Sequence, residues 1–336
     1  MNLLRARPYG WWLAGVVAAL ALAAACAGLD RAAAGEAAGP ASKTEPRGPP
    51  PANLLEKLLK NRAVPEDVEF LPDVEYGKGG ERSLKLDILR PKKAPAQPMP
   101  VVVYIHGGAW KGGSKAGMPP LCNRLAQQGY FCASVGYRFS QEAVFPAQIE
   151  DTKCAIRYLR AHAKQYNINP DRIGAWGHSA GGHLVALLGT AGDAKDLEGK
   201  GGWQDQSSRV QCVIDCFGPT DFTVISKGLE GVKEQMTGPV AQLLGGPVPE
   251  NPEKAAKASP ITYVSKDDPP ILIMHGDADP IVPLRQSERF YEALKKAGVD
   301  ATLHVVKGAG HGFRGPEIEA VTAAFFDKHL RGAKKE

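Results

Sequence analysis

The sequence predicts an α/β fold in which helices cover both faces of a mostly parallel sheet of about eight strands. Val101–Ile105 is a continuous apolar run, typical of a strand buried on both faces. From there on, short apolar runs alternate with segments of helical periodicity, as in repeated β-α units. Val68–Tyr76 and Ser83–Leu89 instead alternate apolar and polar residues, which predicts a half-exposed antiparallel pair.

The composition suits this fold and excludes several classes of protein. Of the 336 residues, 43% are hydrophobic and 23% are charged, unlike wholly disordered or multi-span membrane chains. The formal net charge is +5 without a long basic run, so nothing indicates a nucleic-acid partner. No internal repeat interrupts the alternation, and we expect one domain over residues 53–336.

The same periodicity places the later elements. The expected strands are Phe131–Tyr137, Arg172–Gly177, Val210–Phe217, Ile271–His275 and Thr302–Val306. The expected helices are Lys115–Gln128, Pro146–Tyr166, Ser179–Thr190, Leu284–Ala297 and Pro316–Leu330.

Two stretches, Gly192–Ser208 and Phe222–Ala258, do not fit a minimal β-α unit, because Gly and Pro punctuate both. One interpretation is surface loops with a short helix or two. The other is a small lid over the strand ends, where such sheets bind ligands.

The N-terminal segment has the features of an export signal. Arg5 and Arg7 precede the apolar run Leu13–Ala25, and Cys26 follows it. The run is shorter than the about 20 apolar residues of a membrane span. We expect residues 1–25 to be a signal peptide and the protein to be periplasmic, cell-surface or secreted in a bacterium. Ordinary cleavage, a lipoprotein-type lipid anchor on Cys26 and an uncleaved anchor are the alternatives for its processing.

Residues 26–52 are rich in Ala, Gly, Pro and charge and show no apolar periodicity, which predicts a flexible linker. The folded domain is expected to begin at Asn53, where leucines repeat at helical spacing.

The cysteines predict little covalent cross-linking. Of six cysteines, five remain after Cys26, and an odd number cannot all pair. The two in Val210–Phe217 lie four residues apart, about 13 Å along a strand, which is too far for a disulfide. Most are expected to be small buried apolar residues, and one bridge among Cys122, Cys132 and Cys154 stays open.

The segment Gly177-His178-Ser179-Ala180-Gly181 carries the strongest functional signal. It follows an expected strand and precedes an expected helix, a context that distinguishes a nucleophile elbow from a chance G-x-S-x-G. The glycines are needed because the serine occupies a strained turn where side chains would collide. We therefore expect Ser179 to be a nucleophile and not merely a helix N-cap. The amide of Ala180 would face the developing oxyanion, and His178 is a candidate pocket residue.

A serine nucleophile needs a base and an acid that orients the base. Asp277 and Asp279 follow the expected strand Ile271–His275, so both lie at the sheet edge that carries Ser179. Asp279 lies further into the loop, beside a proline, and is the expected acid. Asp277 is better placed to brace the turn. Asp221, after the preceding strand, is a third candidate acid and a candidate pocket residue.

His311 is the expected general base. It stands among glycines after the last expected strand, so it has no apolar face to fill. The other histidines are less well placed. His183 is expected to pack or cap on its helix, His304 lies within a strand, and His275 ends a strand as a bracing residue.

His106–Trp110, with the sequence His-Gly-Gly-Ala-Trp, follows the buried strand Val101–Ile105. Glycines let backbone amides approach a substrate oxygen, and an H-G-G pattern supplies oxyanion donors. We expect the amides of Gly107 and Gly108 to serve in this role, although the choice of donor within the loop stays open. The histidine is expected to brace the loop, and Trp110 either walls the acyl pocket or packs.

Together these motifs resemble the α/β-hydrolase superfamily, and more narrowly the hormone-sensitive-lipase-like carboxylesterases with an HGG oxyanion loop. Lys111–Ser114, Tyr137-Arg138, Phe145–Gln148 and Glu150-Asp151 further resemble a bacterial branch that includes acetylxylan and feruloyl esterases. The similarity runs from about Val68 to Leu330 and is far more specific for the superfamily than for the substrate.

The chain departs from this pattern in places. Gly136 stands where the family has Asn before Tyr-Arg, which is expected to change only a local backbone contact. Asn53–Arg62 is the only counterpart of the long helical cap of lipase-like members. A small lid argues against long acyl chains and leaves room for a bulky alcohol such as a sugar. Arg138 with Asp151 or Glu150 is expected to be a structural ion pair.

The resemblance implies a serine carboxylesterase that hydrolyses short-chain or aryl acyl esters, notably of acylated carbohydrate, through an acyl-enzyme. The N-terminal signal adds the expectation that this enzyme is exported. Its partner would be a small-molecule or polysaccharide ester. No metal or other cofactor is implied, and the sequence leaves the oligomeric state open. The alternatives are an arylformamidase-like amide hydrolase, a peptidase of the prolyl-oligopeptidase type and, last, a non-catalytic binding protein.

Overall fold

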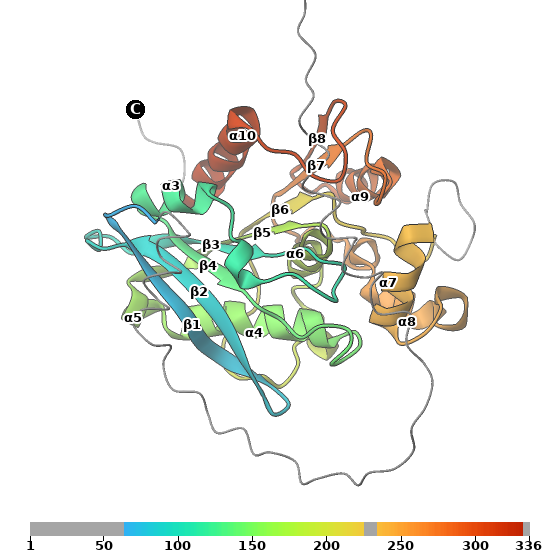
Figure 1. Ribbon diagram of the computed structural model, residues 1–336, viewed down its shortest axis with the longest axis horizontal. Coiled ribbons are helices and arrows are strands. Elements are labelled where there is room, and N and C mark those ends of the chain that lie inside the picture. Colours follow the sequence, from blue (N-terminus) through green and yellow to red (C-terminus); the bar gives the residue numbers. More distant parts are fainter. Residues whose placement is uncertain (1–63, 225–233, 332–336) are drawn as a thin grey trace, which may run out of the picture. The chain divides into compact units, whose positions relative to one another are not determined.

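Eight strands form one sheet in the part of the chain that the structure, a computed structural model, describes: residues 64–224 and 234–331 (Figure 1). Their order is β1-β2-β4-β3-β5-β6-β7-β8. β2 pairs antiparallel with β1 and β4, and the other neighbours pair parallel. The predicted eight-stranded, mostly parallel sheet is therefore confirmed. The strands are β1 Val68–Gly79, β2 Arg82–Pro91, β3 Met99–Ile105, β4 Phe131–Val135, β5 Ile168–His178, β6 Cys212–Cys216, β7 Ile271–Gly276 and β8 Ala301–Val306.

The central strands are buried on both faces, as their continuous apolar runs predict. Every residue of β3 is buried. Val101 and Val103 belong to one hydrophobic cluster, whereas Val102 and Tyr104 belong to a second, because successive side chains point to opposite faces. The sheet therefore separates two apolar layers.

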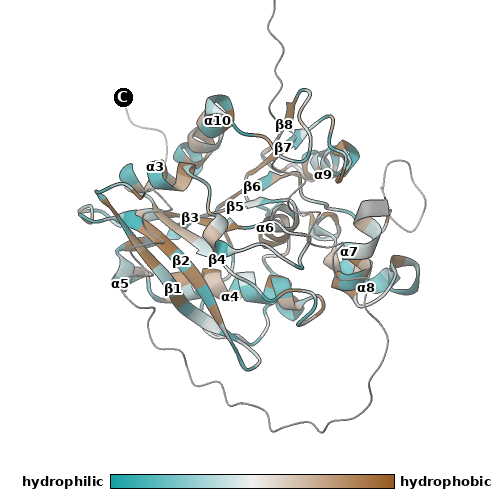
Figure 2. Ribbon diagram, in the orientation of Figure 1, coloured by the Kyte–Doolittle hydropathy of each residue, from teal (hydrophilic) through white to brown (hydrophobic). Residues whose placement is uncertain are grey.

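Helices cover each of these layers. Apolar residues of α4, α6 and α9 pack into the first cluster, and those of α3 and α10 pack into the second. Figure 2 shows hydrophobic and hydrophilic colours alternating along α10, as expected of a helix with one buried face. The helices are α3 Leu121–Gln127, α4 Ala147–Ala161, α5 Ala163–Tyr166, α6 Ala180–Thr190, α7 Glu234–Leu244, α8 Pro252–Ala258, α9 Leu284–Ala297 and α10 Pro316–Phe326.

Three predicted helices differ from the observed ones. The predicted helix Lys115–Gln128 is wrong in its first half, because a 3-10 turn ends at Gly117 and α3 begins only after Pro119-Pro120. The predicted helix Pro146–Tyr166 is two helices, α4 and α5, separated at His162. The last helix, α10, ends at Phe326 and continues as a π-helical turn.

The structure also shows what the two irregular stretches contain, as far as they are described, and whether the cysteines form disulfides. Residues 234–258 contain α7 and α8, whereas residues 191–210 contain one short 3-10 turn. Residues 225–233 lie outside the described residues, so the lid stays a prediction. All five cysteines of the described region are free and buried, and the bridge left open among Cys122, Cys132 and Cys154 does not form.

The N-terminal predictions fall outside the described residues. These are the signal peptide over residues 1–25, the linker over 26–52 and the helical spacing from Asn53. Within residues 64–224 and 234–331, no helix is both long and apolar enough to cross a membrane.

Candidate active site

Ser179 sits in a sharp turn between β5 and α6. Its φ of 55° and ψ of −119° lie in a region that non-glycine residues rarely adopt. A Cβ atom on Gly177 would overlap the carbonyl oxygen of Gly181, and one on Gly181 would overlap that of Ile105. The Ser179 amide donates to the carbonyl of Cys216 at 2.9 Å, which ties the turn to β6. The two glycines of the motif are therefore required by packing on both sides of the serine.

The hydroxyl of Ser179 meets His311 and not the helix that follows it. Ser179 makes no side-chain capping bond to α6. Its Oγ lies 2.8 Å from Nε2 of His311, and Nδ1 of His311 lies 2.7 Å from Oδ2 of Asp279. The structure thus brings these three sequence-predicted residues together from the loops after β5, β7 and β8.

Asp279 is fixed by hydrogen bonds to both of its oxygens. Oδ1 accepts from the amides of Ile281 at 2.7 Å and Val282 at 3.0 Å, and Oδ2 lies 3.2 Å from Nε2 of His275. Burial alone would raise the pKa of Asp279, but hydrogen bonds from His275, His311 and the Ile281 amide outweigh it. They hold its pKa well below the usual range, so the carboxylate is ionised at neutral pH.

The two competing aspartates have other partners. Asp277 is exposed, and its Oδ1 accepts from the amide of Gly308 at 2.6 Å, which is the bracing role expected of it. Asp221 is buried and pairs with Arg289 at 2.7 Å, while its other oxygen accepts from the hydroxyl of Thr223 at 2.6 Å. Of the three candidate acids, Asp279 is the one that is hydrogen-bonded to the imidazole.

The glycine loop after β3 lies directly against the elbow. A Cβ atom on Gly107 would lie 2.8 Å from the carbonyl oxygen of His178 and 3.3 Å from the Cβ of Ser179. Gly108 has a φ of +124°, which favours glycine. Within the described ranges, the amides of Gly107, Gly108 and Ala180 donate to no protein acceptor. Ala180 opens α6, where first-turn amides have no helical partner.

His106 and Tyr137 brace this loop. Nδ1 of His106 lies 2.8 Å from the carbonyl oxygen of Gly107. The imidazole stacks on the ring of Tyr137 with centroids 4.5 Å apart, and the Tyr137 hydroxyl donates to the His106 carbonyl at 3.0 Å. The stacked rings of His106 and Tyr137 therefore support the glycine loop, and this is the bracing role that the sequence predicted for His106.

Two of the candidate pocket residues lie in different surroundings. Trp110 is only 3% exposed, and its Nε1 donates to Nδ1 of His183 at 3.1 Å. His178 is half-buried beside the nucleophile, with Nδ1 3.1 Å from the hydroxyl of Tyr104. Burial, with smaller contributions from the charges of Arg314 and His311, lowers the pKa of His178 to about 4, so it is neutral at pH 7.

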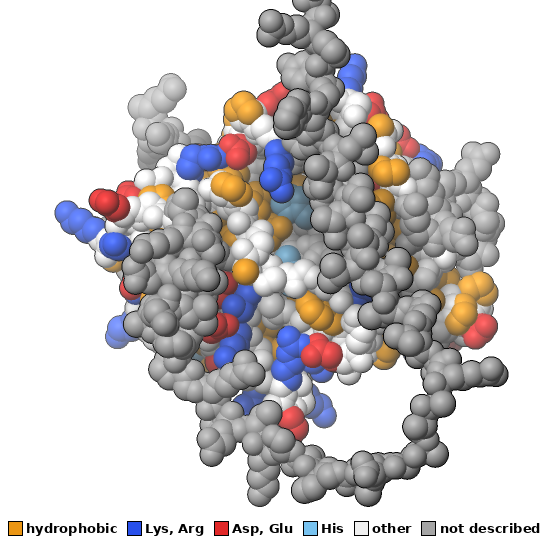
Figure 3. Space-filling view, in the orientation of Figure 1, with side chains coloured by type: hydrophobic (Ala, Val, Ile, Leu, Met, Phe, Trp, Pro, Cys, Tyr) orange, Lys and Arg blue, Asp and Glu red, His pale blue; other side chains and the backbone are white. Residues whose placement is uncertain are grey.

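Sequence reasoning missed Phe217, which contacts the base. Its ring centroid lies 4.7 Å from that of His311 and 5.2 Å from that of Phe313, in edge-to-face geometry. Phe217 directly follows β6, and that position at the carboxyl edge was the available signal. In Figure 3, histidine surface appears near the middle of the face shown, bordered by a basic side chain and by hydrophobic and uncharged atoms.

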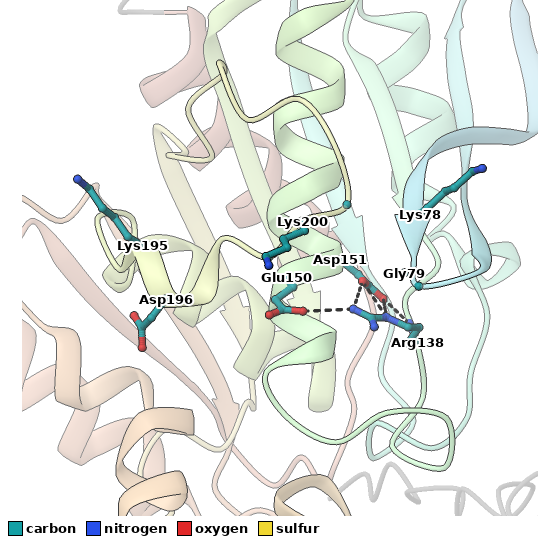
Figure 4. Close-up of a pocket in the computed structure, with 11 residues that line it drawn as sticks. Lys78, Gly79, Arg138, Glu150, Asp151, Lys195, Asp196 and Lys200 are labelled. Carbon is teal, nitrogen blue, oxygen red and sulfur yellow. Dashed lines mark hydrogen bonds and ion pairs between the residues drawn. The ribbon is translucent and has the colours of Figure 1, made fainter.

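A separate cleft of about 550 Å³ contains none of the triad residues (Figure 4). Its lining includes the ion pair of Arg138 with Asp151 at 2.7 Å, which Glu150 extends at 3.4 Å. Asp151 also accepts from the backbone amide of Arg138 at 2.8 Å. This pair is structural, as expected, because it anchors the segment after β4 to α4.

An eight-stranded sheet with a strand–serine–helix elbow and a histidine from the loop after the last strand defines the α/β-hydrolase class. Residues 86–294 match the BD-FAE family, and the chain belongs to that family.

Curated and solved relatives agree with this assignment. Esterase LipQ of Mycobacterium tuberculosis is 35% identical over 72% of this chain and 56% of its own length. The chain thus spans little more than half of that relative. A truncated carbohydrate esterase from gut microbiota is 36% identical, with a TM-score of 0.72 over 80% of this chain and 99% of that one. The butyrate-bound esterase Est2 of the planctomycete Thermogutta terrifontis is 28% identical, with a TM-score of 0.67 over 81% and 97%.

Proposed function

We propose that the protein is a serine carboxylesterase whose catalytic residues are Ser179, His311 and Asp279. The observation that carries the proposal is the unbroken line of hydrogen bonds from the Ser179 hydroxyl through His311 to Asp279. A base within 2.8 Å of the hydroxyl can take its proton, and an ionised acid at the other imidazole nitrogen stabilises the charge that results.

The acylation half-reaction follows from this geometry. Nε2 of His311 accepts the Ser179 proton while Oγ forms a bond to the ester carbonyl carbon. The carbonyl π electrons move to the oxygen, which the amides of Gly107, Gly108 and Ala180 receive. When the tetrahedral intermediate collapses, the C–O bond to the alcohol breaks and His311 protonates the departing oxygen.

Deacylation repeats these steps with water. His311 removes a proton from water, the hydroxide oxygen attacks the acyl carbonyl, and the same amides hold the second oxyanion. Collapse returns the proton to Ser179 Oγ and releases the carboxylic acid. Each proton removed by the imidazole is thus given back, so the cycle needs no other co-reactant.

For the substrate, we propose short-chain or aryl acyl esters of carbohydrate. Support comes from the relatives, one a carbohydrate esterase and another an esterase with bound butyrate. The experiment is a panel on purified protein with Ser179→Ala as the blank: p-nitrophenyl esters of rising chain length, acetylated xylan, a feruloylated oligosaccharide and an aryl formamide. Acetate or ferulate release from the saccharides supports the proposal. Faster turnover of the aryl formamide than of the esters would instead indicate an amide hydrolase.

We also propose that the protein is exported, which places it where polysaccharides occur. The support is the basic, apolar and small-residue pattern of residues 1–25 and Cys26. Cell fractionation with and without that segment tests this, and radiolabelled fatty acid incorporation that depends on Cys26 would identify a lipid anchor.

The choice of acid can be tested with two neighbouring aspartates. Asp279→Asn is expected to lower kcat by about 10³- to 10⁴-fold, because the imidazole loses the group that fixes its tautomer and charge. Asp277→Asn is the matched control, and because Asp277 only braces the turn, we expect a change of less than about threefold. Steady-state kinetics with a p-nitrophenyl ester measures both. A larger loss for Asp277→Asn would move the acid role to that residue.

The same variant carries a pH signature in stability. Since the folded-state pKa of Asp279 is depressed, its contribution to the free energy of unfolding is present above pH ~4 and is lost as the pH falls further. Asp279→Asn should therefore be less stable than wild type at pH 7, and the difference in their free energies of unfolding should be smaller at pH 3. Urea titrations at both pH values test this, and a difference that grows in acid would contradict it.

A further inference from the structure

A second histidine is built into the support of the triad carboxylate. His275 is the second-to-last residue of β7, and its side chain is completely buried. Its Nδ1 is 2.7 Å from Oγ of Ser287, on α9. Its Nε2 is 2.9 Å from the carbonyl oxygen of Val282 and 3.2 Å from Oδ2 of Asp279. The imidazole thus connects a helix, a strand and the catalytic loop.

The partners determine where the proton of this imidazole lies. A backbone carbonyl and an ionised carboxylate can only accept hydrogen bonds, so Nε2 of His275 must carry the hydrogen. In a neutral imidazole Nδ1 is then an acceptor, and the hydroxyl of Ser287 must donate to it. Ser287 is itself fully buried, which keeps water from competing for that position.

Donor groups therefore lie against both oxygens of the carboxylate. Two amides bind Oδ1 of Asp279, while His311 and His275 share Oδ2. The single hydrogen on Nε2 of His275 is shared, because the Val282 carbonyl oxygen lies 2.9 Å from this nitrogen and Oδ2 of Asp279 lies 3.2 Å from it. The donor from His275 is on the same oxygen that holds His311, and it therefore restrains that oxygen directly.

We propose that His275 is a positioning residue of the reaction: its Nε2–H holds Oδ2 of Asp279 in place against His311, and Ser287 fixes the tautomer that allows this. The proposal rests on the catalytic roles of Ser179, His311 and Asp279 proposed above. His275 is buried and does not touch the reacting serine; it acts through Asp279. Its removal should therefore slow the chemical step and leave substrate binding largely unchanged.

The test compares two replacements of His275 that differ in the donor they retain. His275→Gln places an amide N–H near the position of Nε2, whereas His275→Leu removes the donor. For His275→Leu we expect kcat to fall by about 10- to 100-fold at nearly constant KM, as for loss of a hydrogen bond to a charged group. His275→Gln should recover most of that loss.

A second pair addresses the tautomer. Ser287→Ala removes the hydroxyl that donates to Nδ1 of His275. We expect it to lower kcat, but by less than His275→Leu does. Ser287→Thr retains the hydroxyl and should keep most of the activity. In proton NMR spectra, the low-field signal of the hydrogen bond between His311 and Asp279 should shift or broaden in His275→Leu and Ser287→Ala and persist in His275→Gln.

A purely architectural role would give a different pattern. Equal losses of thermal stability in His275→Leu and His275→Gln, with wild-type kcat per folded molecule and an unchanged low-field signal, would overturn the proposal. If His275→Leu does not fold, the comparison of Ser287→Ala with Ser287→Thr tests the proposal instead. Equal kcat values for these two variants would refute the positioning role of His275. Failure of the proposed function itself would appear separately, as undiminished activity in Ser179→Ala.

Discussion

Replacement of Ser179 by alanine is expected to lower kcat for a p-nitrophenyl ester by at least about 10³-fold while the protein stays folded. The change removes only Oγ, the atom that faces His311 at 2.8 Å. Alanine retains the Cβ atom and can occupy the same turn, so the strained backbone and its tie to β6 should persist. Steady-state kinetics and circular dichroism measure the two properties.

The control for this variant is Ser265→Ala, at an exposed serine whose hydroxyl bonds Asp268. Its kcat should stay within about twofold of wild type, since surface substitutions away from such sites change little. If Ser179→Ala instead kept wild-type kcat with a native spectrum, the elbow would not carry the nucleophile.

Gly181→Ala is expected to damage both stability and activity. The added Cβ would overlap the carbonyl oxygen of Ile105, which belongs to the backbone of β3 and cannot rotate away as a flexible side chain could. Such overpacking costs roughly 1–3 kcal/mol of the free energy of unfolding. It would also push the elbow away from the Gly107 loop, so kcat should fall by more than about 10²-fold, as for loss of an oxyanion donor.

Gly117→Ala is the matched control, because a Cβ there meets no heavy atom within 4 Å. Its free energy of unfolding should stay within about 0.5 kcal/mol of wild type. Urea denaturation and ester kinetics on both variants provide the comparison. Equal midpoints and equal kcat for the two alanine variants would show that the elbow does not need a glycine at position 181.

Much of the site could be predicted from the sequence because the fold orders it. In a parallel sheet, the carboxyl ends of the strands share one edge, so motifs that follow β3, β5, β7 and β8 must converge there. This reasoning led to Ser179, Asp279 and His311, which the structure joins by hydrogen bonds. The buried strands were equally predictable, because a short continuous apolar run is typical of a strand that is covered on both faces.

Other features depend on contacts that periodicity does not encode. The break between α4 and α5 at His162 lies inside a stretch whose apolar spacing continues. The late start of α3 is different, because Pro119-Pro120 signals it in the sequence. The ring of Phe217 reaches His311 only because β6 ends beside the triad. The hydrogen bond between Ser287 and His275 joins α9 to β7. Nothing in the sequence around either residue distinguishes it from a buried residue without a functional role.

The account depends most on Ser179 being the nucleophile, and covalent labelling tests this most directly. The protein is incubated with a fluorophosphonate, and intact mass and peptide mapping then locate the adduct. We predict one adduct per chain, on the peptide that contains Ser179, lost in Ser179→Ala and formed more slowly in Asp279→Asn. An adduct on another residue, or ester turnover without any adduct, would contradict the account.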